Sequence, residues 1–375
     1  MEASVTFDPP ARLLLGPGPS PVHPRVTRAL AAPALGHLDP ALLLMLDEIR
    51  GLLRQVFRTA NERTLAVSGT GMAGMEALLG NLLEPGERLL VCTAGFFGQR
   101  IAELAERMGV EVTRLEKPWG EVLSVAEVDA AAAQARPKAV AVVHAETSTG
   151  ALQPLEGLGE VARRHGALLI VDCVTSLGGV PLEVDGWGID AAYSGTQKCL
   201  GGPAGLSPVT LGPRAVETAA RRRRPPHSWY LNLGLLERYW GGDHAYHHTI
   251  SAPLVYALLE GLRVVAEEGL EARWARHRAN AEHLWRGLAA MGLQLHVEER
   301  CRIPSLTTVR VPDGVDEAAV RTRLREAYGI EIGSGLGPLK GRIWRIGLMG
   351  HGSQLANAEL LLAALRDCLE GARRR

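Results

Sequence analysis

The sequence predicts an α/β fold in which a large, mostly parallel β-sheet is followed by a smaller α+β unit. Length and composition are the first observation, because 375 residues with 46% hydrophobic and 22% charged residues are ordinary for a globular chain of more than one unit. The second is an alternation of short β-rich runs with helical stretches from about residue 64 onward. The third is that these runs are apolar without alternation, which is typical of parallel strands covered on both faces.

Seven runs are predicted as strands of the large sheet, and helical stretches separate the first five of them. The runs lie at 64–68, 88–93, 110–115, 139–146, 167–174, 190–195 and 206–212. The helical stretches lie at 74–83, 100–109, 125–135 and 158–166. The seventh run follows the sixth so closely that it is a candidate for an antiparallel strand.

The rest of the chain has a different pattern. Residues 221–250 are rich in Tyr, Trp, His and Gly and are predicted as a long irregular connection, which in compact domains is often functional. A long helical region follows at about 252–287. The smaller unit is predicted from strands at 293–298, 305–312, 330–335 and 344–350 and from helices at about 316–328 and 353–371. We expect a large domain over 16–265 and a small domain over 266–375, with residues 1–15 packed on the small one.

Charge and cysteine usage exclude several classes of function. The 41 basic residues balance 41 acidic ones, so the chain has no overall field for nucleic acid or for an anionic membrane. No uncharged apolar run reaches about 18 residues, and the first residues lack a signal-peptide pattern. Five widely spaced cysteines without a C-x-x-C pair favour reduced thiols. We expect a soluble, cytoplasmic protein with no nucleic-acid or membrane partner.

Gly69, Gly71 and Gly74 form a G-x-G-x-x-G pattern between a predicted strand and a predicted helix. A dinucleotide site also needs an acidic residue about 20 positions further on, at the end of the next strand. That strand ends at 93–95 without one. A phosphate site at the helix N-terminus is therefore favoured, and a plain strand-to-helix turn is the alternative.

Asp172 and Lys198 each come at or just after the end of a predicted strand. Ligands gather at that edge of an open parallel sheet. A buried carboxylate needs a cation or several hydrogen bonds, and a lysine in apolar surroundings has a lowered pKa and becomes a usable nucleophile. Taken alone, Asp172 is equally well a turn or helix-cap residue, and Lys198 is more often structural. The chain's other lysines, Lys117, Lys138 and Lys340, stand in sequences typical of solvated positions.

Taken together, these three signals match the chemical needs of pyridoxal phosphate (PLP). The cofactor has a phosphate to anchor, a ring nitrogen that must stay protonated, and an aldehyde that needs an amine. Other sequence features are weaker evidence of function. His247 and His248 are adjacent in an extended segment and should point to opposite sides, so we expect no metal site. Arg221–Arg224 is expected as a solvated loop, and Cys173 and Cys199 as small buried residues beside the site.

The chain contains several specific sequence motifs: Leu-Gly-Pro-Gly-Pro at 15–19, Ser-Gly-Thr-Gly at 68–71, Gly-Gln-Arg at 98–100, Glu-Thr-Ser-Thr-Gly at 146–150, Val-Asp-Cys-Val-Thr-Ser-Leu-Gly-Gly at 171–179, Tyr-Ser-Gly-Thr-Gln-Lys at 193–198, Tyr-His-His-Thr at 246–249 and Arg-Ile-Gly-Leu-Met-Gly at 345–350. In these strings the chain resembles the alanine–glyoxylate and serine–pyruvate aminotransferases, which belong to class V of the fold-type I PLP enzymes. The resemblance runs from about Leu13 to the last helix.

The resemblance implies how the cofactor is held. Lys198 would form the Schiff base with PLP, and Asp172 would pair with its pyridinium nitrogen. The cofactor phosphate would lie against Thr70, Gly71, Met72 and Gln197. Two further phosphate contacts would come from the partner subunit of a homodimer whose active sites are shared, through Tyr246 and Thr249.

The resemblance also implies which residues surround the ring and the substrate. Phe97 would stack on one ring face, Val174 would pack on the other, and Thr147 would lie near the ring hydroxyl. Arg345 would bind the substrate carboxylate, with Gly18 also in the substrate site. Phe97 and Met72 depart from the tryptophan and histidine usual in the animal enzymes; both changes leave PLP binding intact and bear on substrate choice.

The predicted activity is a ping-pong amino transfer from a small amino acid, alanine or serine, to glyoxylate or pyruvate. Within the same fold, the alternatives are ureidoglycine–glyoxylate and aminoethylphosphonate–pyruvate aminotransferases. A cysteine-desulfurase relative would need a mobile loop cysteine, and none stands out. Outside this class, the alternatives are an NAD-dependent oxidoreductase built on Gly69–Gly74 and a catalytically silent binding protein.

Overall fold

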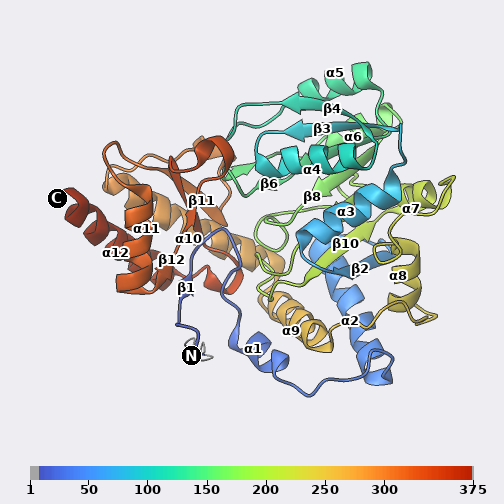
Figure 1. The fold of residues 1–375 in the computed structure, drawn as a ribbon, viewed down its shortest axis with the longest axis horizontal. Coiled ribbons are helices and arrows are strands. Elements are labelled where there is room, and N and C mark those ends of the chain that lie inside the picture. The colour runs from blue at the N-terminus through green and yellow to red at the C-terminus, as the bar shows by residue number, and fades with distance from the viewer. Residues whose placement is uncertain (1–7, 374–375) are drawn as a thin grey trace, which may run out of the picture.

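A seven-stranded sheet forms the centre of the larger part of the molecule, on the right of Figure 1. The computed structural model describes residues 8–373. The strand order is β2-β10-β9-β8-β5-β3-β4, in which β10 is antiparallel to both neighbours and the other pairs are parallel. The predicted mostly parallel sheet is therefore confirmed. Its strands are β2 (Arg63–Ser68), β3 (Arg88–Thr93), β4 (Glu111–Glu116), β5 (Ala139–Val143), β8 (Leu168–Asp172), β9 (Ala191–Tyr193) and β10 (Leu206–Leu211).

Helices pack on this sheet and bury its apolar strands. Helix α3 contacts β2, β9 and β10, α4 contacts β3 and β5, and α6 contacts β8. Residues of β5 and β8 are buried throughout, which explains their continuous apolar sequence. The helices of this part are α1 (Pro24–Leu30), α2 (Pro40–Phe57), α3 (Gly71–Leu82), α4 (Phe96–Arg107), α5 (Val125–Ala135), α6 (Leu158–Arg164), α7 (Pro213–Ala220), α8 (Leu233–Trp240) and α9 (Ala252–Glu268).

The smaller part, on the left of Figure 1, has a three-stranded antiparallel sheet of order β11-β14-β13. Near the N-terminus, β1 (Leu13–Leu14) pairs with β12 (Ile330–Glu331), and Leu15 is buried in the same apolar core as Trp344. Residues 1–7 of the predicted N-terminal segment lie outside the described residues. The remaining elements are β11 (Leu306–Arg310), β13 (Gly333–Ser334), β14 (Ile343–Gly347), α10 (Leu270–Ala290), α11 (Glu317–Tyr328), α12 (Leu355–Arg373) and the 3₁₀ turns η1 (Glu299–Cys301), η2 (Gly337–Leu339) and η3 (Gly350–Gly352).

The structure differs from one helix prediction and divides the region of another. Residues 221–250 are not irregular throughout, because they contain α8, which Asn232 caps by accepting from the N–H groups of Gly234 and Leu235. The helical region 252–287 is two helices, α9 and α10, because Gly269 adopts φ +79° between them.

Strand predictions were wrong in two further places. Residues 293–298 form no strand and join β11 through a single bridge between Leu295 and Val309; the chain then turns into η1. Residues 139–146 divide into β5 and the short β6 (Ala145–Glu146), which pairs with β7 (Ala151–Leu152) away from the large sheet.

None of the helices within residues 8–373 combines the length and the apolar character that a bilayer crossing requires.

Helix α3 is held very close to the sheet by Gly74. A Cβ added at this glycine would lie 2.2 Å from Ser207 Oγ of β10 and 3.0 Å from Tyr193 Cβ of β9. Gly80, two turns further along the same helix, would meet only the Met108 Cε, at 3.8 Å. Since α3 begins directly at the predicted phosphate site, its distance from the sheet positions that site.

We therefore expect Gly74→Ala to lower the free energy of unfolding by about 1–3 kcal/mol, because the added methyl group overpacks the contact between helix and sheet. Gly80→Ala is the matched control and should raise it by about 0.5–1 kcal/mol through helix propensity alone. Urea unfolding of both variants measures the difference. Equal effects of the two substitutions would show that α3 can move away from the sheet at no cost.

Candidate active site

One pocket lies where the carboxyl ends of β5, β8 and β9 meet the N-terminal ends of α3 and α4. It contains most of the residues that the sequence predicted for the cofactor, drawn from segments more than 100 positions apart. Met75, Val143, Ala145 and Tyr193 also line it and were not predicted as site residues. The predicted residues in its lining are Thr70, Gly71, Met72, Phe97, Thr147, Asp172, Val174, Gln197 and Lys198.

Asp172, the last residue of β8, is the buried carboxylate of this pocket, with 3% of its surface exposed. Its Oδ1 accepts the Val174 N–H at 2.9 Å and its Oδ2 accepts the Tyr193 hydroxyl at 2.7 Å. Burial raises the pKa of Asp172 to about 6 against these hydrogen bonds. The carboxylate has no ion-pair partner among the described residues, so it is available to a cationic ligand.

Lys198 follows β9 and is 9% exposed. Its Nζ donates to the Pro17 carbonyl and to no carboxylate of the described residues. Burial, and secondly the positive charge of Arg345, lower the pKa of Lys198 to about 8. By contrast, Lys117 and Lys138 form ion pairs with Glu127 and Glu87. Lys198 is therefore the lysine with the character of a nucleophile.

A segment from the N-terminal region covers the Lys198 loop. Gly18 has φ +99°, and a Cβ on it would lie 2.6 Å from Lys198 Nζ, so a side chain would collide with the amine. Ser20 donates through its Oγ to the Lys198 carbonyl at 2.8 Å and through its N–H to the Gln197 carbonyl at 2.9 Å. This brings the predicted Gly18 beside the amine.

The N-terminal end of α3 has the features of a phosphate site. The Thr70 side chain makes no capping hydrogen bond, and the first-turn N–H groups of a helix are free to bind an anion. A Cβ at Gly71 would lie 2.7 Å from Val174 Cγ2, so the backbone approaches closely. Gln197 Oε1 is buried without a hydrogen-bond partner in the described part of the chain, but an amide oxygen only accepts, so Gln197 would bind a phosphate through its amide NH2 group. These features fit a phosphate-bearing cofactor.

Glu146 supports the pocket, although it is not among the predicted site residues. Its carboxylate is 4% exposed and accepts the N–H groups of Phe97 at 3.1 Å and Gly98 at 3.3 Å, in the first turn of α4. It also accepts the Ser148 hydroxyl at 2.6 Å, and burial raises its pKa. Glu146 thereby determines where Phe97 stands.

Arg345, on β14 of the small sheet, reaches the edge of the pocket. Its Nε donates to the Ser334 carbonyl at 2.6 Å and its Nη1 to the Thr147 carbonyl at 3.3 Å, which leaves Nη2 without a partner in the described residues. The side chain is mostly buried, and burial lowers its pKa to about 10, against the raising effect of Glu146. A guanidinium held by neutral carbonyls keeps its charge for a carboxylate ligand.

Tyr246 and Thr249 do not line this pocket in the chain itself. Tyr246 is 61% exposed and Thr249 is also exposed. The expectation that His247 and His248 point apart was wrong, because their Nδ1 atoms lie 2.9 Å apart and His248 Nε2 lies 2.7 Å from Ser68 Oγ. The two rings join the 246–249 loop to the end of β2. No group of three or more possible metal ligands occurs in the described residues.

Arg221, Arg223 and Arg224 are exposed, as expected of a solvated loop, while Arg222 donates to the Leu83 carbonyl and the backbone N–H groups of Arg223 and Arg224 donate to Glu84. The five cysteines are all free and buried. That includes Cys173 and Cys199 beside the pocket, as expected.

Comparison with known proteins identifies relatives over almost the whole chain. Residues 27–340 match the family model described as aminotransferase class-V. A solved alanine–glyoxylate aminotransferase from Nostoc sp. is 51% identical, with a TM-score of 0.96 and 98% of each chain covered. The (S)-ureidoglycine–glyoxylate transaminase of Bacillus subtilis is 41% identical over 96% of this chain and 91% of its own. The alanine–glyoxylate aminotransferase of Callithrix jacchus is 43% identical over 96% and 88%.

Fold and pocket together define a fold-type I enzyme that uses pyridoxal phosphate. The chain belongs to the class V aminotransferase family, as the sequence motifs indicated. This decides against the oxidoreductase interpretation of Gly69–Gly74. A cysteine desulfurase from Thermococcus onnurineus, at 17% identity, shares the fold alone.

The unpaired burial of Asp172 predicts a pH-dependent stability of the cofactor-free protein. The raised pKa means that the folded state binds a proton between about pH 4 and 6 that the unfolded chain does not, so the stability contributed by this residue falls as pH rises through that window. Asp172→Asn should raise the free energy of unfolding at pH 8 by on the order of 2–3 kcal/mol, and by about half as much at pH 5.

Urea unfolding at the two pH values measures this. Tyr193→Phe is the matched control, because it removes a donor from the carboxylate and should lower stability at pH 8. An Asp172→Asn variant less stable than the native protein at pH 8 would contradict the assigned cost of burial.

Proposed function

We propose that this aminotransferase moves the amino group of a small amino acid, alanine or serine, to glyoxylate or pyruvate in two half-reactions at one site. The observation that carries the proposal is the position of Arg345, which bonds to the Thr147 carbonyl at the edge of the pocket that contains Asp172 and Lys198. The named activities of the relatives support alanine as the donor and glyoxylate as the acceptor. The Bacillus subtilis relative makes ureidoglycine–glyoxylate transfer the second candidate; aminoethylphosphonate–pyruvate transfer is a third.

Different residues of the pocket would bind different parts of PLP. Thr70, Gly71, Met72 and Gln197 would bind the phosphate, Asp172 would bind the ring nitrogen, Phe97 and Val174 would pack on the ring faces, and Thr147 would lie near the ring hydroxyl. Lys198 binds the aldehyde. When bound, PLP supplies an electron-withdrawing ring and a carbonyl group for covalent attachment of the amino group.

Lys198 Nζ is also the group that moves the proton. A pKa of about 8 leaves a substantial neutral fraction near neutral pH, so the amine accepts a proton from the substrate Cα and returns it later. Asp172, with a pKa of about 6, is ionised at that pH and would favour a proton on the ring nitrogen of the bound cofactor. The two groups therefore work in the same pH range.

A panel of alanine, serine, glycine, ureidoglycine and aminoethylphosphonate, each with glyoxylate or pyruvate as acceptor, tests the substrate assignment. We expect the highest kcat/KM for alanine or serine. A clear preference for ureidoglycine or for aminoethylphosphonate would replace the assignment by the corresponding alternative.

Arg345→Lys should raise KM for both the amino donor and the oxo acceptor, because both carry an α-carboxylate and use one site. A lysine ammonium is a point charge and cannot form the two parallel bonds of a guanidinium. Losing one charge-assisted bond costs about 1.5–3 kcal/mol, or roughly 10- to 150-fold in kcat/KM. Arg342→Lys, at an exposed neighbour, is the control. An effect on only one half-reaction would contradict a shared carboxylate site.

We also infer that the enzyme is a cytoplasmic homodimer in which Tyr246 and Thr249 of each subunit complete the phosphate site of the other. Their exposure outside the pocket of their own chain supports this arrangement. When Lys198→Ala and Tyr246→Ala/Thr249→Ala subunits are each inactive, mixing them should restore about one quarter of native activity, because random exchange gives half hybrids with one intact site each. No recovery in confirmed hybrids would show that the loop serves its own subunit.

A further inference from the structure

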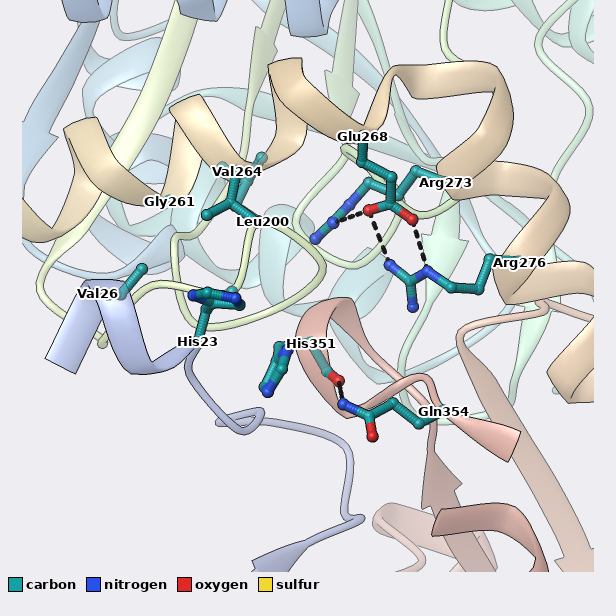
Figure 2. A pocket seen from close by; sticks show the side chains of 11 residues that line it. His23, Val26, Leu200, Gly261, Val264, Glu268, Arg273, Arg276, His351 and Gln354 are labelled. Carbon is teal, nitrogen blue, oxygen red and sulfur yellow. Dashed lines mark hydrogen bonds and ion pairs between the residues drawn. The ribbon is translucent and has the colours of Figure 1, made fainter. Parts of the chain in front are cut away.

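A second pocket lies next to the active site, at the part of the loop that follows Lys198. Leu200 and Gly201 line it, between α1 and α9 on one side and α10 with the turn at 350–354 on the other (Figure 2). No residue of this pocket has a part in the proposed reaction. Its lining combines a charged wall with an apolar one.

Two arginines and one carboxylate form the charged wall. Glu268 accepts Arg273 Nη1 at 2.6 Å and Arg276 Nε at 2.5 Å, so one negative charge faces two positive ones. Arg276 Nη2 also donates to Glu268, at 2.9 Å, and the remaining bonds go to neutral carbonyls, those of Gly178 and Cys199 for Arg273 and those of Gly350 and Ser353 for Arg276. The wall therefore keeps an excess positive charge.

Two imidazoles add hydrogen-bond donors. His23 Nδ1 accepts the Arg25 N–H at 3.1 Å, so its neutral ring carries the proton on Nε2 and can donate it. His351 lies across from it, with 4.9 Å between ring centroids, and its ring makes no hydrogen bond to any described residue. Burial, and then the nearby His23, Arg276 and Arg273, lower the pKa of His351. The surroundings of that ring are thus positive and favour an anion.

The opposite wall is apolar. It is lined by Val26 of α1, by Leu200 of the loop that carries Lys198, and by Val264 of α9. Gly261, also on α9, leaves space because it has no side chain. A Cβ at Gly261 would meet nothing closer than the Leu200 carbonyl oxygen at 3.5 Å. This wall would contact an aliphatic group, whereas inorganic phosphate would leave it uncovered.

We propose that this pocket binds a small aliphatic carboxylate, with its charged end at Arg273, Arg276, His23 and His351 and its hydrocarbon part against the apolar wall. The ligand would contact the supports of the active site on both sides. Arg273 bonds to the carbonyl of Cys199, next to Lys198, and Arg276 bonds to the carbonyl of Gly350, on the segment that follows Arg345.

The thermal unfolding of the PLP-bound enzyme tests the proposal, with isobutyrate as probe and isobutyramide as its uncharged isostere. At about 50 mM and constant ionic strength we expect isobutyrate to raise Tm by roughly 3 °C and the amide by much less. Gly261→Leu should remove most of this rise by filling the pocket. Isobutyrate bound at Arg345 contributes equally in both proteins, so the difference reports the second pocket. Gly80→Leu, at a helix position where an added Cβ would meet only Met108 Cε at 3.8 Å, is the matched control.

If Gly261→Leu loses its native circular dichroism or PLP absorbance, His23→Asn combined with His351→Leu replaces it, since asparagine retains a cap for α1. An equal rise of Tm in the native enzyme and the pocket variant would overturn the proposal. So would an equal rise with isobutyramide. An equal rise with inorganic phosphate would show an unselective anion site and overturn the carboxylate assignment.

Discussion

The structure depends on keeping a carboxylate and an amine buried in the same pocket without pairing them. Asp172 is held by a tyrosine hydroxyl and a backbone N–H, and Lys198 by a backbone carbonyl. Burial therefore moves the pKa of each toward neutral pH, to about 6 and about 8. A direct ion pair would instead have fixed both charges and occupied the groups that a cofactor needs.

Keeping these groups apart requires rigid supports on every side of the pocket. Gly74 lets α3 lie against the sheet, and Glu146 joins the first turn of α4 to the β6 segment. Both helices then present their N-terminal ends at the carboxyl edge of the sheet. Backbone geometry would therefore position the phosphate of a bound cofactor, with little dependence on the exposed Met72 side chain.

The Lys198 loop is tied from three directions. Ser20 bonds to the Lys198 carbonyl from the N-terminal segment, Arg273 bonds to the Cys199 carbonyl from α10, and β9 leads into the loop from the sheet. Because α10 and the segment 13–15 also pack with the small sheet, movement of that sheet would reach the loop directly. The pocket at Arg273 and Arg276 lies at this junction.

The sequence alone determined the alternation of strands and helices, the antiparallel candidate at 206–212, and the strand-end positions of Asp172 and Lys198. These features follow from local hydrophobic pattern and from the rule that ligands gather at the carboxyl edge of a parallel sheet. The Asn232 cap and the apolar spacing of α8 were also readable but were masked by the aromatic and histidine content around them. Only the tertiary structure decided that Tyr193 holds Asp172, that Glu146 places Phe97, and that Gly18 covers Lys198. Each of these contacts joins residues that are distant in sequence. Strand order and helix packing determine such contacts, and a local sequence pattern predicts neither the strand order nor the packing.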